Sequence, residues 1–337
     1  MNLLKKGRDG ETKRGREGEM ERQRDGERER WRDKEMERWR DKETERGGDG
    51  EICYFYIQSD IDDMFVKPES AERIISATGQ IAAWLGYCLK ARHRRGHGVH
   101  SPFVFELITS VLNDHKGYAE YEAAEGYRRS LKKNRLRVSI TDFGAGSGAG
   151  IKQNRTVSDI TRRASVNRKF GRLLFRLARH YKPDMIIELG TSLGISTCYL
   201  AAGNPEARVV TVEADPALAA LADEGLKRIK LMNVSLINDT FDHALSSLLP
   251  QAPRRTLVFI DGNHSRTATL KYAGFFLSAL PDSSLIVFHD INWSEDMRQA
   301  WKEIKANKKG TFTIDLFSMG IVFIKHGFFK ENYTIRF

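Results

Sequence analysis

The stretch that decides the fold is Ile186-Ile187-Glu188-Leu189-Gly190-Thr191-Ser192-Leu193-Gly194. Its apolar start predicts a buried strand, and its two glycines predict a sharp turn into a helix. Further along, a second apolar run, Val209-Val210-Thr211-Val212-Glu213, ends in an acid. A strand, a glycine turn, a helix and a second strand tipped with a carboxylate are typical of a nucleoside-binding α/β site. The sequence therefore favours an enzyme that acts on a small molecule.

The spacing of the acids and glycines indicates which kind of nucleotide binds. The dinucleotide fingerprint is G-x-G-x-x-G, whereas here Glu188 stands two residues before Gly190, and Gly194 follows after three more. A carboxylate at a strand end would repel a pyrophosphate and attract an ammonium or sulfonium group. At the second strand, Glu213 can accept hydrogen bonds from both hydroxyls of a ribose. The sequence thus predicts a positively charged adenosine compound.

This segment resembles motif I of the class I S-adenosylmethionine-dependent methyltransferases, and the resemblance covers residues 165–337. It implies S-adenosyl-L-methionine as the cofactor, with the ribose at the second acid and the adenine near Asn238-Asp239-Thr240. The cofactor-binding residues expected from the motif and the resemblance are Glu188, Gly190, Thr191, Ser192, Gly194, Glu213, Asp239, Thr240 and Asp261.

The rest of this segment alternates between helix and strand patterns, which predicts a doubly wound parallel sheet covered on both faces. Helices are expected at 170–180, 216–230, 241–249 and 267–280, and strands at 234–237, 256–261 and 284–290. The last two apolar runs, 311–317 and 321–324, are separated only by Ser318-Met319-Gly320. This gap is too short for a parallel crossover, so we expect an antiparallel hairpin. The expected fold is a mostly parallel, Rossmann-like sheet of seven strands with a C-terminal hairpin.

Residues 1–50 form a low-complexity tail that repeats with period eight, as in 23–30 (QRDGERER) and 31–38 (WRDKEMER). The tail holds 16 Lys/Arg and 15 Asp/Glu, so nearly all of the formal charge of +10 lies elsewhere. Too few apolar groups are present to offset chain entropy, so we expect a disordered tail; a charged-helix interaction arm is the alternative. Met64 is an alternative start of the chain, which would also remove the apolar stretch 52–57.

Residues 64–164 are predicted to be a helical accessory or lid region. Its stretch Ile140-Thr141-Asp142-Phe143-Gly144 imitates the nucleoside motif, but the polar, basic residues 152–163 follow it with no second apolar strand. We therefore expect a glycine-rich loop here rather than the cofactor site. His97 and His100 precede a helix capped by Ser101-Pro102, and capping or packing is favoured over metal binding.

Basic runs occur at 92–95 and 128–135, and we interpret them as solvated surface rather than a nucleic-acid site, because no groove-reading motif accompanies them. Three scattered cysteines, Cys53, Cys88 and Cys198, indicate no disulfide framework or zinc site. The helical stretch 74–89 is short of a membrane span, and no secretory signal is visible. These features favour a cytoplasmic protein without a transmembrane segment. Oligomeric state stays open, with a homodimer among the alternatives.

Methyl transfer from a sulfonium is an in-line displacement that needs alignment, a dry cavity and sometimes a base. The segment Asp261-Gly262-Asn263-His264 resembles the Asp-Gly-x-His segment of O-methyltransferase-like proteins. His264 is the first choice of general base, since imidazole titrates near neutral pH; His289 is the second, or else a structural histidine. The predicted catalytic residues are therefore His264, Asp261, His289 and Asp290.

The metal-dependent branch of the family uses an acid after the fourth strand and an Asp-Asn pair after the fifth. Here Ile291 stands where the Asn would be, so a divalent metal such as Mg²⁺ is not favoured unless Asn292 reaches in. The predicted reaction is O-methylation of a small-molecule acceptor. The alternatives are an NAD-dependent oxidoreductase on a related nucleotide site and a catalytically silent cofactor-binding module.

Overall fold

A computed structural model describes residues 71–142, 151–248, 253, 255–325 and 327–337 of the chain. The chain divides into two compact units, residues 1–77 and residues 78–337. The tail at 1–50, the apolar stretch 52–57 and Met64 lie outside the described residues, as does the glycine-rich segment 143–150. The described residues belong to the larger unit, apart from the first turns of the helix α3 (Ala71–Lys90).

The centre of the larger unit is an eight-stranded sheet with the order β10-β8-β9-β7-β6-β3-β4-β5. Five neighbouring strands run parallel: β3 (Met185–Leu189), β4 (Arg208–Glu213), β5 (Val234–Asn238), β6 (Thr256–Ile260) and β7 (Ser284–His289). The chain builds outward from β3 through β4 to β5 and then returns to β6 on the other side. The carboxyl ends of β3 and β6 therefore flank the switch point of strand order, where α/β sheets bind ligands.

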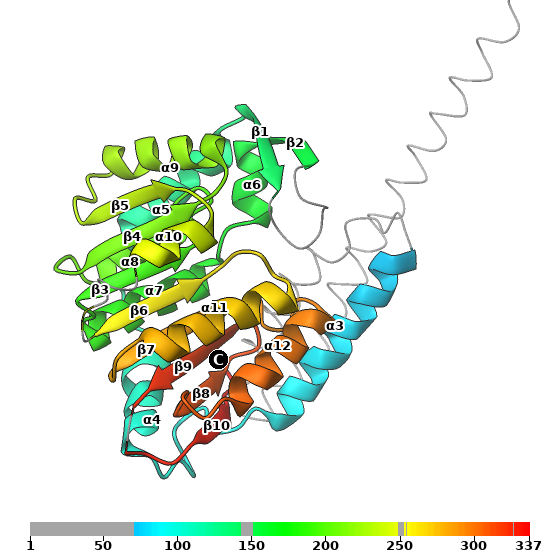
Figure 1. Cartoon of the computed structure of the whole chain (residues 1–337), viewed down its shortest axis with the longest axis vertical. Helices are drawn as coiled ribbons and strands as arrows, with labels where there is room; N and C mark the ends of the chain where they lie inside the picture. Colours follow the sequence, from blue (N-terminus) through cyan, green and yellow to red (C-terminus); the bar gives the residue numbers. More distant parts are fainter. Residues whose placement is uncertain (1–70, 143–150, 249–252, 254, 326) are drawn as a thin grey trace, which may run out of the picture. The chain divides into compact units, whose positions relative to one another are not determined.

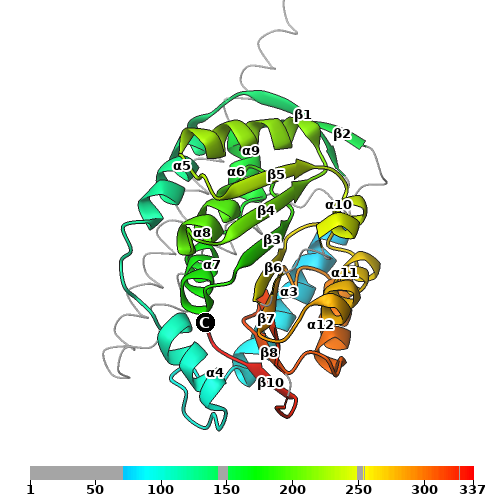
Figure 2. The ribbon, with the colours of Figure 1, turned by 60° about the vertical axis from the view of Figure 1, so that its left-hand side comes forward.

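Helices cover both faces of the sheet (Figures 1 and 2). Side chains that alternate along the parallel strands enter two separate buried clusters, so that Ile186 packs on one side and Ile187 on the other. One cluster includes side chains from α7 (Arg168–Tyr181) and α8 (Ile195–Gly203); the other includes side chains from α10 (Phe241–Leu248), α11 (Arg266–Ala279) and α12 (Glu295–Ala306). Helix α9 (Pro216–Arg228) connects β4 to β5. The three layers confirm the doubly wound α/β arrangement.

The end of the chain confirms the predicted hairpin and adds a strand. β8 (Phe312–Asp315) and β9 (Met319–Ile324) pair antiparallel, and β9 also pairs antiparallel with β7. The prediction of seven strands was wrong, because β10 (Glu331–Thr334) joins the edge of the sheet parallel to β8. Its polar sequence, Glu-Asn-Tyr-Thr, carries no apolar alternation, since an edge strand packs only partly against the core.

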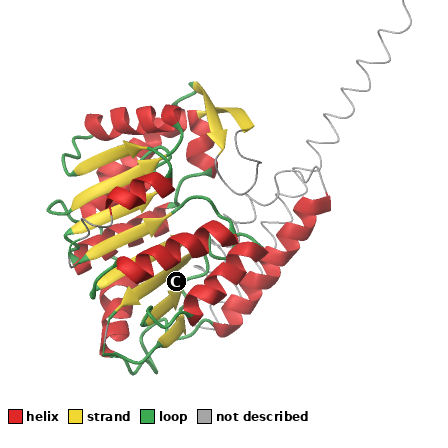
Figure 3. Cartoon of the chain, viewed as in Figure 1, coloured by secondary structure: helices red, strands yellow, loops and turns green. Residues whose placement is uncertain are grey.

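The accessory region contains both helices and a small sheet (Figure 3). Its helical elements are α4 (Pro102–Leu107), a π-helical turn at Ile108–Leu112, α5 (Tyr121–Lys133) and α6 (Val157–Arg163). A strand follows the imitation motif where a loop was expected: β1 (Arg137–Asp142) pairs antiparallel with the polar strand β2 (Ile151–Thr156). β2 is not the second apolar strand of a nucleotide site, and an antiparallel hairpin does not supply the strand-to-helix crossover of such a site. Among the described residues, no helix is long and apolar enough to span a membrane.

Candidate active site

The turn that follows β3 is held closely against the end of β6. Gly190 has a φ of 106° and Gly194 a φ of 78°, both in the left-handed region that favours glycine. A Cβ atom on Gly190 would lie 2.1 Å from the carbonyl oxygen of Asp261. No side chain fits in that space, so the glycine brings the turn and Asp261 together at the switch point.

Glu213 ends β4 beside this turn. Its carboxylate accepts a hydrogen bond of 2.8 Å from the backbone N–H of Ser192 and one of 2.9 Å from the backbone N–H of Asp215. Burial raises the pKa of Glu213, while the backbone hydrogen bonds oppose the rise. Since the residue is only partly buried, its carboxylate can both fix the turn and meet a ligand at the sheet edge.

Glu188 lies within β3 and points away from the sheet edge, toward the helix α8. The side chain is completely buried, and its Oε2 atom accepts hydrogen bonds from the hydroxyls of Thr197 and Thr211. The Ser196 hydroxyl also lies near this carboxylate and lowers its pKa. Burial raises the pKa of Glu188 to about 7 despite the neighbouring hydroxyls. The Thr191 hydroxyl is also buried, 2.5 Å from that of Thr211, so both predicted cofactor residues turn their side chains inward.

Asp239 and Thr240 follow β5, next along the same edge. The backbone N–H of Asp239 donates to the carbonyl of Glu213, and the Asp239 carboxylate accepts from the N–H of Thr240 at 2.7 Å. The other Asp239 oxygen contacts the ring of His243, which lowers the pKa of the carboxyl group. The structure therefore places Asp239 beside Glu213, as expected for two groups that share one nucleoside.

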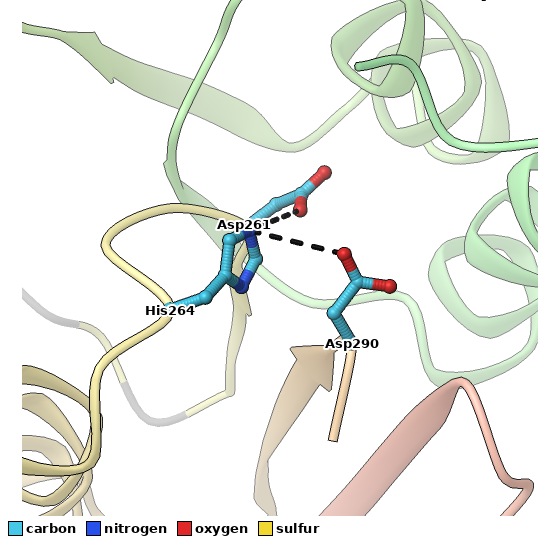
Figure 4. A group of neighbouring side chains, drawn as sticks. All are labelled: Asp261, His264 and Asp290. Carbon is cyan, nitrogen blue, oxygen red and sulfur yellow. Dashed lines mark ion pairs between the residues drawn. The ribbon is translucent and has the colours of Figure 1, made fainter. Parts of the chain in front are cut away.

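A cluster of acids and histidines lies where β6 and β7 end. Asp261 and His264 come from the loop after β6, and Asp290 follows β7 (Figure 4). The Nε2 atom of His264 lies 3.8 Å from a carboxylate oxygen of Asp261 and 3.9 Å from one of Asp290. The Nδ1 atom of His289 lies 2.8 Å from the same Asp261 oxygen. The four predicted catalytic residues therefore form one cluster of neighbouring side chains.

The two histidines differ in their surroundings. Burial of His289 disfavours its charge, but Asp261 and Asp290 outweigh this effect and raise the pKa of His289 to about 9. Burial raises the pKa of Asp261, but the charge of His289 and its hydrogen bond outweigh this effect. The pKa of Asp261 therefore lies below its usual range. At neutral pH these two residues form a partly enclosed ion pair. The His264 side chain is 30% exposed, against 14% for His289, and so is the more accessible ring.

Three residues in the loops at this edge of the sheet have left-handed backbone conformations. Ser192, Asn263 and Asp290 all have φ values between 48° and 55°, which residues other than glycine seldom adopt. Such conformations persist only where the surrounding structure enforces them, and they gather at functional sites. Here they lie in the loops after β3, β6 and β7.

The sequence model of a methyltransferase domain matches residues 187–291. The match begins in β3 and ends just after Asp290, so it contains every predicted catalytic residue. The match supports methyl transfer over nicotinamide chemistry.

Solved structures similar to the chain include three methyltransferases. An O-methyltransferase from Bacillus cereus in complex with SAH shares 21% identity over 48% of this chain and 84% of its own, with a TM-score of 0.42. The SAH-bound methyltransferase PaMTH1 from Podospora anserina shares 18% identity, covering 67% and 97% of the two chains, with a TM-score of 0.44. The O-methyltransferase TomG from Streptomyces achromogenes, in complex with SAM, shares 17% identity, covering 66% and 96%, with a TM-score of 0.44. No curated protein matches the chain.

The matched segment offers one group of potential metal ligands among the described residues, Asp261, His264 and Asp290. One ligand atom from each lies within 4.8 Å of the others, and all three residues are partly exposed. Two carboxylates and an imidazole fit a divalent cation. Asn292 does not reach in, because its side-chain amide donates to the carbonyl of Phe317. His97 and His100 belong to no such group in the part of the chain that the structure describes.

Sequence reasoning missed two residues that contact the cofactor side of the domain. Asp215 caps α9 and donates its backbone N–H to Glu213; the Asp-Pro pair at the start of a predicted helix is the signal that could have found it. Tyr127 of α5 donates its hydroxyl to the carbonyl of Leu193, within the glycine turn. Tyr127 lies 66 residues before Leu193, so no local sequence pattern indicated that the two residues meet.

Proposed function

We propose that the protein is an S-adenosylmethionine-dependent methyltransferase that methylates a hydroxyl group of a small molecule. The observation that carries this proposal is the contact between Gly190 and Asp261. It joins the nucleoside edge, with Glu213, to the acid and histidine cluster, with His264. When bound, S-adenosylmethionine supplies a methyl group attached to a sulfonium. In an in-line displacement the acceptor oxygen bonds to this methyl group, and S-adenosylhomocysteine leaves as a neutral thioether.

Four features of the nucleoside edge fit this cofactor. The partly exposed carboxylate of Glu213 suits the ribose hydroxyls, and the Asp239–Thr240 turn beside it suits the adenine. The glycine turn gives close backbone access. The buried carboxylate of Glu188 attracts a positive group near the turn through its charge and without direct contact. These residues favour a cationic ligand over a pyrophosphate.

We assign the general base to His264. It is the more exposed of the two rings, and the carboxylates of Asp261 and Asp290 lie near enough to stabilise the imidazolium that forms when it takes the acceptor's proton. His289 holds its proton at neutral pH because of its raised pKa, so it is unsuited to accept one. Its role is to fix the Asp261 carboxylate.

A divalent cation is the alternative to a general base for activating the acceptor hydroxyl. Asp261, His264 and Asp290 would hold it, and it would polarise the acceptor hydroxyl. The ion pair between His289 and Asp261 places a competing positive charge on one of the ligands. We therefore favour base catalysis by His264, and metal addition after chelation separates the two possibilities.

The test is transfer of a labelled methyl group. The purified protein is incubated with S-adenosylmethionine carrying a tritiated methyl group and with small-molecule extracts of cells that lack the gene, with and without EDTA. A labelled product is expected in the wild-type reaction and not with His264→Ala, although both proteins bind S-adenosylhomocysteine. Binding without transfer in every fraction would favour a silent module. Loss of activity in EDTA, restored by Mg²⁺, would favour the metal route.

The same proposal includes a cytoplasmic location and a homodimer as the assembly to test. Cell fractionation checks the first, and light scattering coupled to gel filtration checks the second. No nucleic acid is included as a substrate, and a mobility-shift assay with RNA and DNA tests that part.

A further inference from the structure

A tyrosine from outside the matched segment reaches the glycine turn. Tyr127 lies on α5, and its hydroxyl donates a hydrogen bond of 2.9 Å to the carbonyl oxygen of Leu193. Tyr127 is 3% exposed and Leu193 is 1% exposed, so water has little access to either partner. Leu193 lies between Ser192, whose N–H binds Glu213, and Gly194, the N-cap residue of α8. The tyrosine therefore holds the turn at the residue next to the one that binds Glu213.

Helix α9 makes room for this hydroxyl. Gly225 lies in the interior of α9, where glycine makes a helix less stable than alanine does. A Cβ atom there would lie 1.9 Å from the hydroxyl oxygen of Tyr127. The less stabilising residue, glycine, therefore stands where any larger side chain would displace the Tyr127 hydroxyl. Two residues far apart in sequence are matched so that this contact can form.

A second contact ties the same accessory segment to the neighbouring loop. One carboxylate oxygen of Asp215 caps α9 by accepting from the N–H groups of Ala217 and Leu218. The other accepts from the backbone N–H of Thr141 on β1, at 2.7 Å. Asp215 also donates its own N–H to Glu213. Residues 121–142 therefore contact both loops that position Glu213.

We propose that Tyr127 is a positioning residue for cofactor binding. It holds the carbonyl of Leu193 and so keeps the turn from Gly190 to Gly194 in the conformation in which Ser192 meets Glu213. Without that hydrogen bond, a buried carbonyl loses its partner, and the turn samples other conformations before it binds. The inference rests on the proposed function, because it takes this turn to bind the adenosine part of S-adenosylmethionine.

The test compares Tyr127→Phe with Tyr118→Phe. Tyr118 precedes α5 and donates its hydroxyl to Asp114 at 2.5 Å, so the control removes a tyrosine hydrogen bond of the same region away from the turn. Titration calorimetry is run with S-adenosylhomocysteine, well below the melting temperature of each variant. The dissociation constant is expected to rise about 5- to 20-fold in Tyr127→Phe and to stay at the wild-type value in Tyr118→Phe.

Hydrogen exchange separates positioning from general destabilisation. In the free protein, amides of residues 189–198 are expected to exchange faster in Tyr127→Phe, with the strands of the sheet unchanged. Wild-type affinity in Tyr127→Phe, or equal losses in both variants, would overturn the inference and leave the proposed function standing. Failure of the wild-type protein to bind S-adenosylhomocysteine would overturn both.

Discussion

Two carboxylates near the glycine turn have different surroundings. Glu213 is partly buried, accepts backbone hydrogen bonds from both flanking loops and lies at the end of its strand. Glu188 lies inside its strand, is completely buried, and meets the hydroxyls of Thr197 and Thr211. Direct contact with the ribose is therefore expected of Glu213, whereas Glu188 acts on a ligand through charge.

Replacing Glu213 with alanine is expected to weaken binding of S-adenosylhomocysteine by about 1–3 kcal/mol, the typical effect of losing a charged hydrogen-bond acceptor. Titration calorimetry measures the change. Glu206→Ala serves as the control, because Glu206 is exposed at the opposite end of β4. Unchanged affinity in Glu213→Ala would remove this residue from the site.

The ion pair of His289 predicts a pH-dependent stability. Folding raises the pKa of His289 from 6.5 to about 9. The pair therefore stabilises the fold fully below pH 6.5, and this contribution is lost as the pH rises to 9 and above. The full change is about 3 kcal/mol, and urea unfolding in EDTA at several pH values measures it. His289→Asn should flatten the dependence; an identical slope in the two proteins would contradict the assignment.

At the scale of elements, the glycine of the turn after β3 and an exposed glycine of α11 should respond in opposite ways to alanine. Gly190→Ala places a Cβ atom 2.1 Å from a carbonyl oxygen at a φ of 106°, so we expect a loss of about 3 kcal/mol or more in unfolding free energy. Gly274 in α11 is exposed and has open space around its Cβ position. Gly274→Ala should stabilise the protein by about 0.5–1 kcal/mol. Equal effects of the two substitutions in thermal unfolding would refute this expectation.

The sequence predicted most of the sheet because its strands carry strong local signals. Continuous apolar runs of β6 and β7 and the capped helix between them appear within two residues of their predicted limits. The edge strand β10 and the hairpin strand β2 were missed, since both are polar and depend on pairing with distant residues. Local pattern cannot report such pairing.

The candidate site was predictable for a related reason. The carboxyl ends of parallel strands meet at one edge, so five acids at the ends of five strands were expected to gather there: Glu188, Glu213, Asp239, Asp261 and Asp290. Side-chain direction was not predictable, and Glu188 turned inward because alternation along β3 directs it to the α8 face. The support from Tyr127 depends on how α5 packs, which no local motif encodes.

At the scale of the larger unit, the last residues of the chain close the core beside α3. The Tyr87 hydroxyl donates to the carbonyl of Ile335 at 2.6 Å and accepts from the N–H of Phe337 at 3.3 Å. The ring of Phe337 lies 5.5 Å from that of Phe170, and the ammonium group of Lys169 lies 4.3 Å above its centre.

Phe337→Ala should therefore lower the unfolding free energy by about 1–3 kcal/mol, through lost ring contacts. Chemical denaturation measures this change. Phe329→Ala is the control, because Phe329 is 92% exposed and its loss should change stability by less than about 0.5 kcal/mol. A similar change in both variants would show that Phe337 adds nothing to the core.

The enclosed carboxyl group of Glu188 has a thermodynamic consequence. With a pKa of about 7, it is partly protonated in neutral solution. A cation entering the adjoining turn favours the ionised form, so association should expel a fraction of a proton into the medium. The apparent heat will then differ between phosphate and Tris, whose ionisation enthalpies are unlike. Glu188→Gln should abolish that difference, and identical heats for the wild-type protein would mean that the arriving charge does not reach this group.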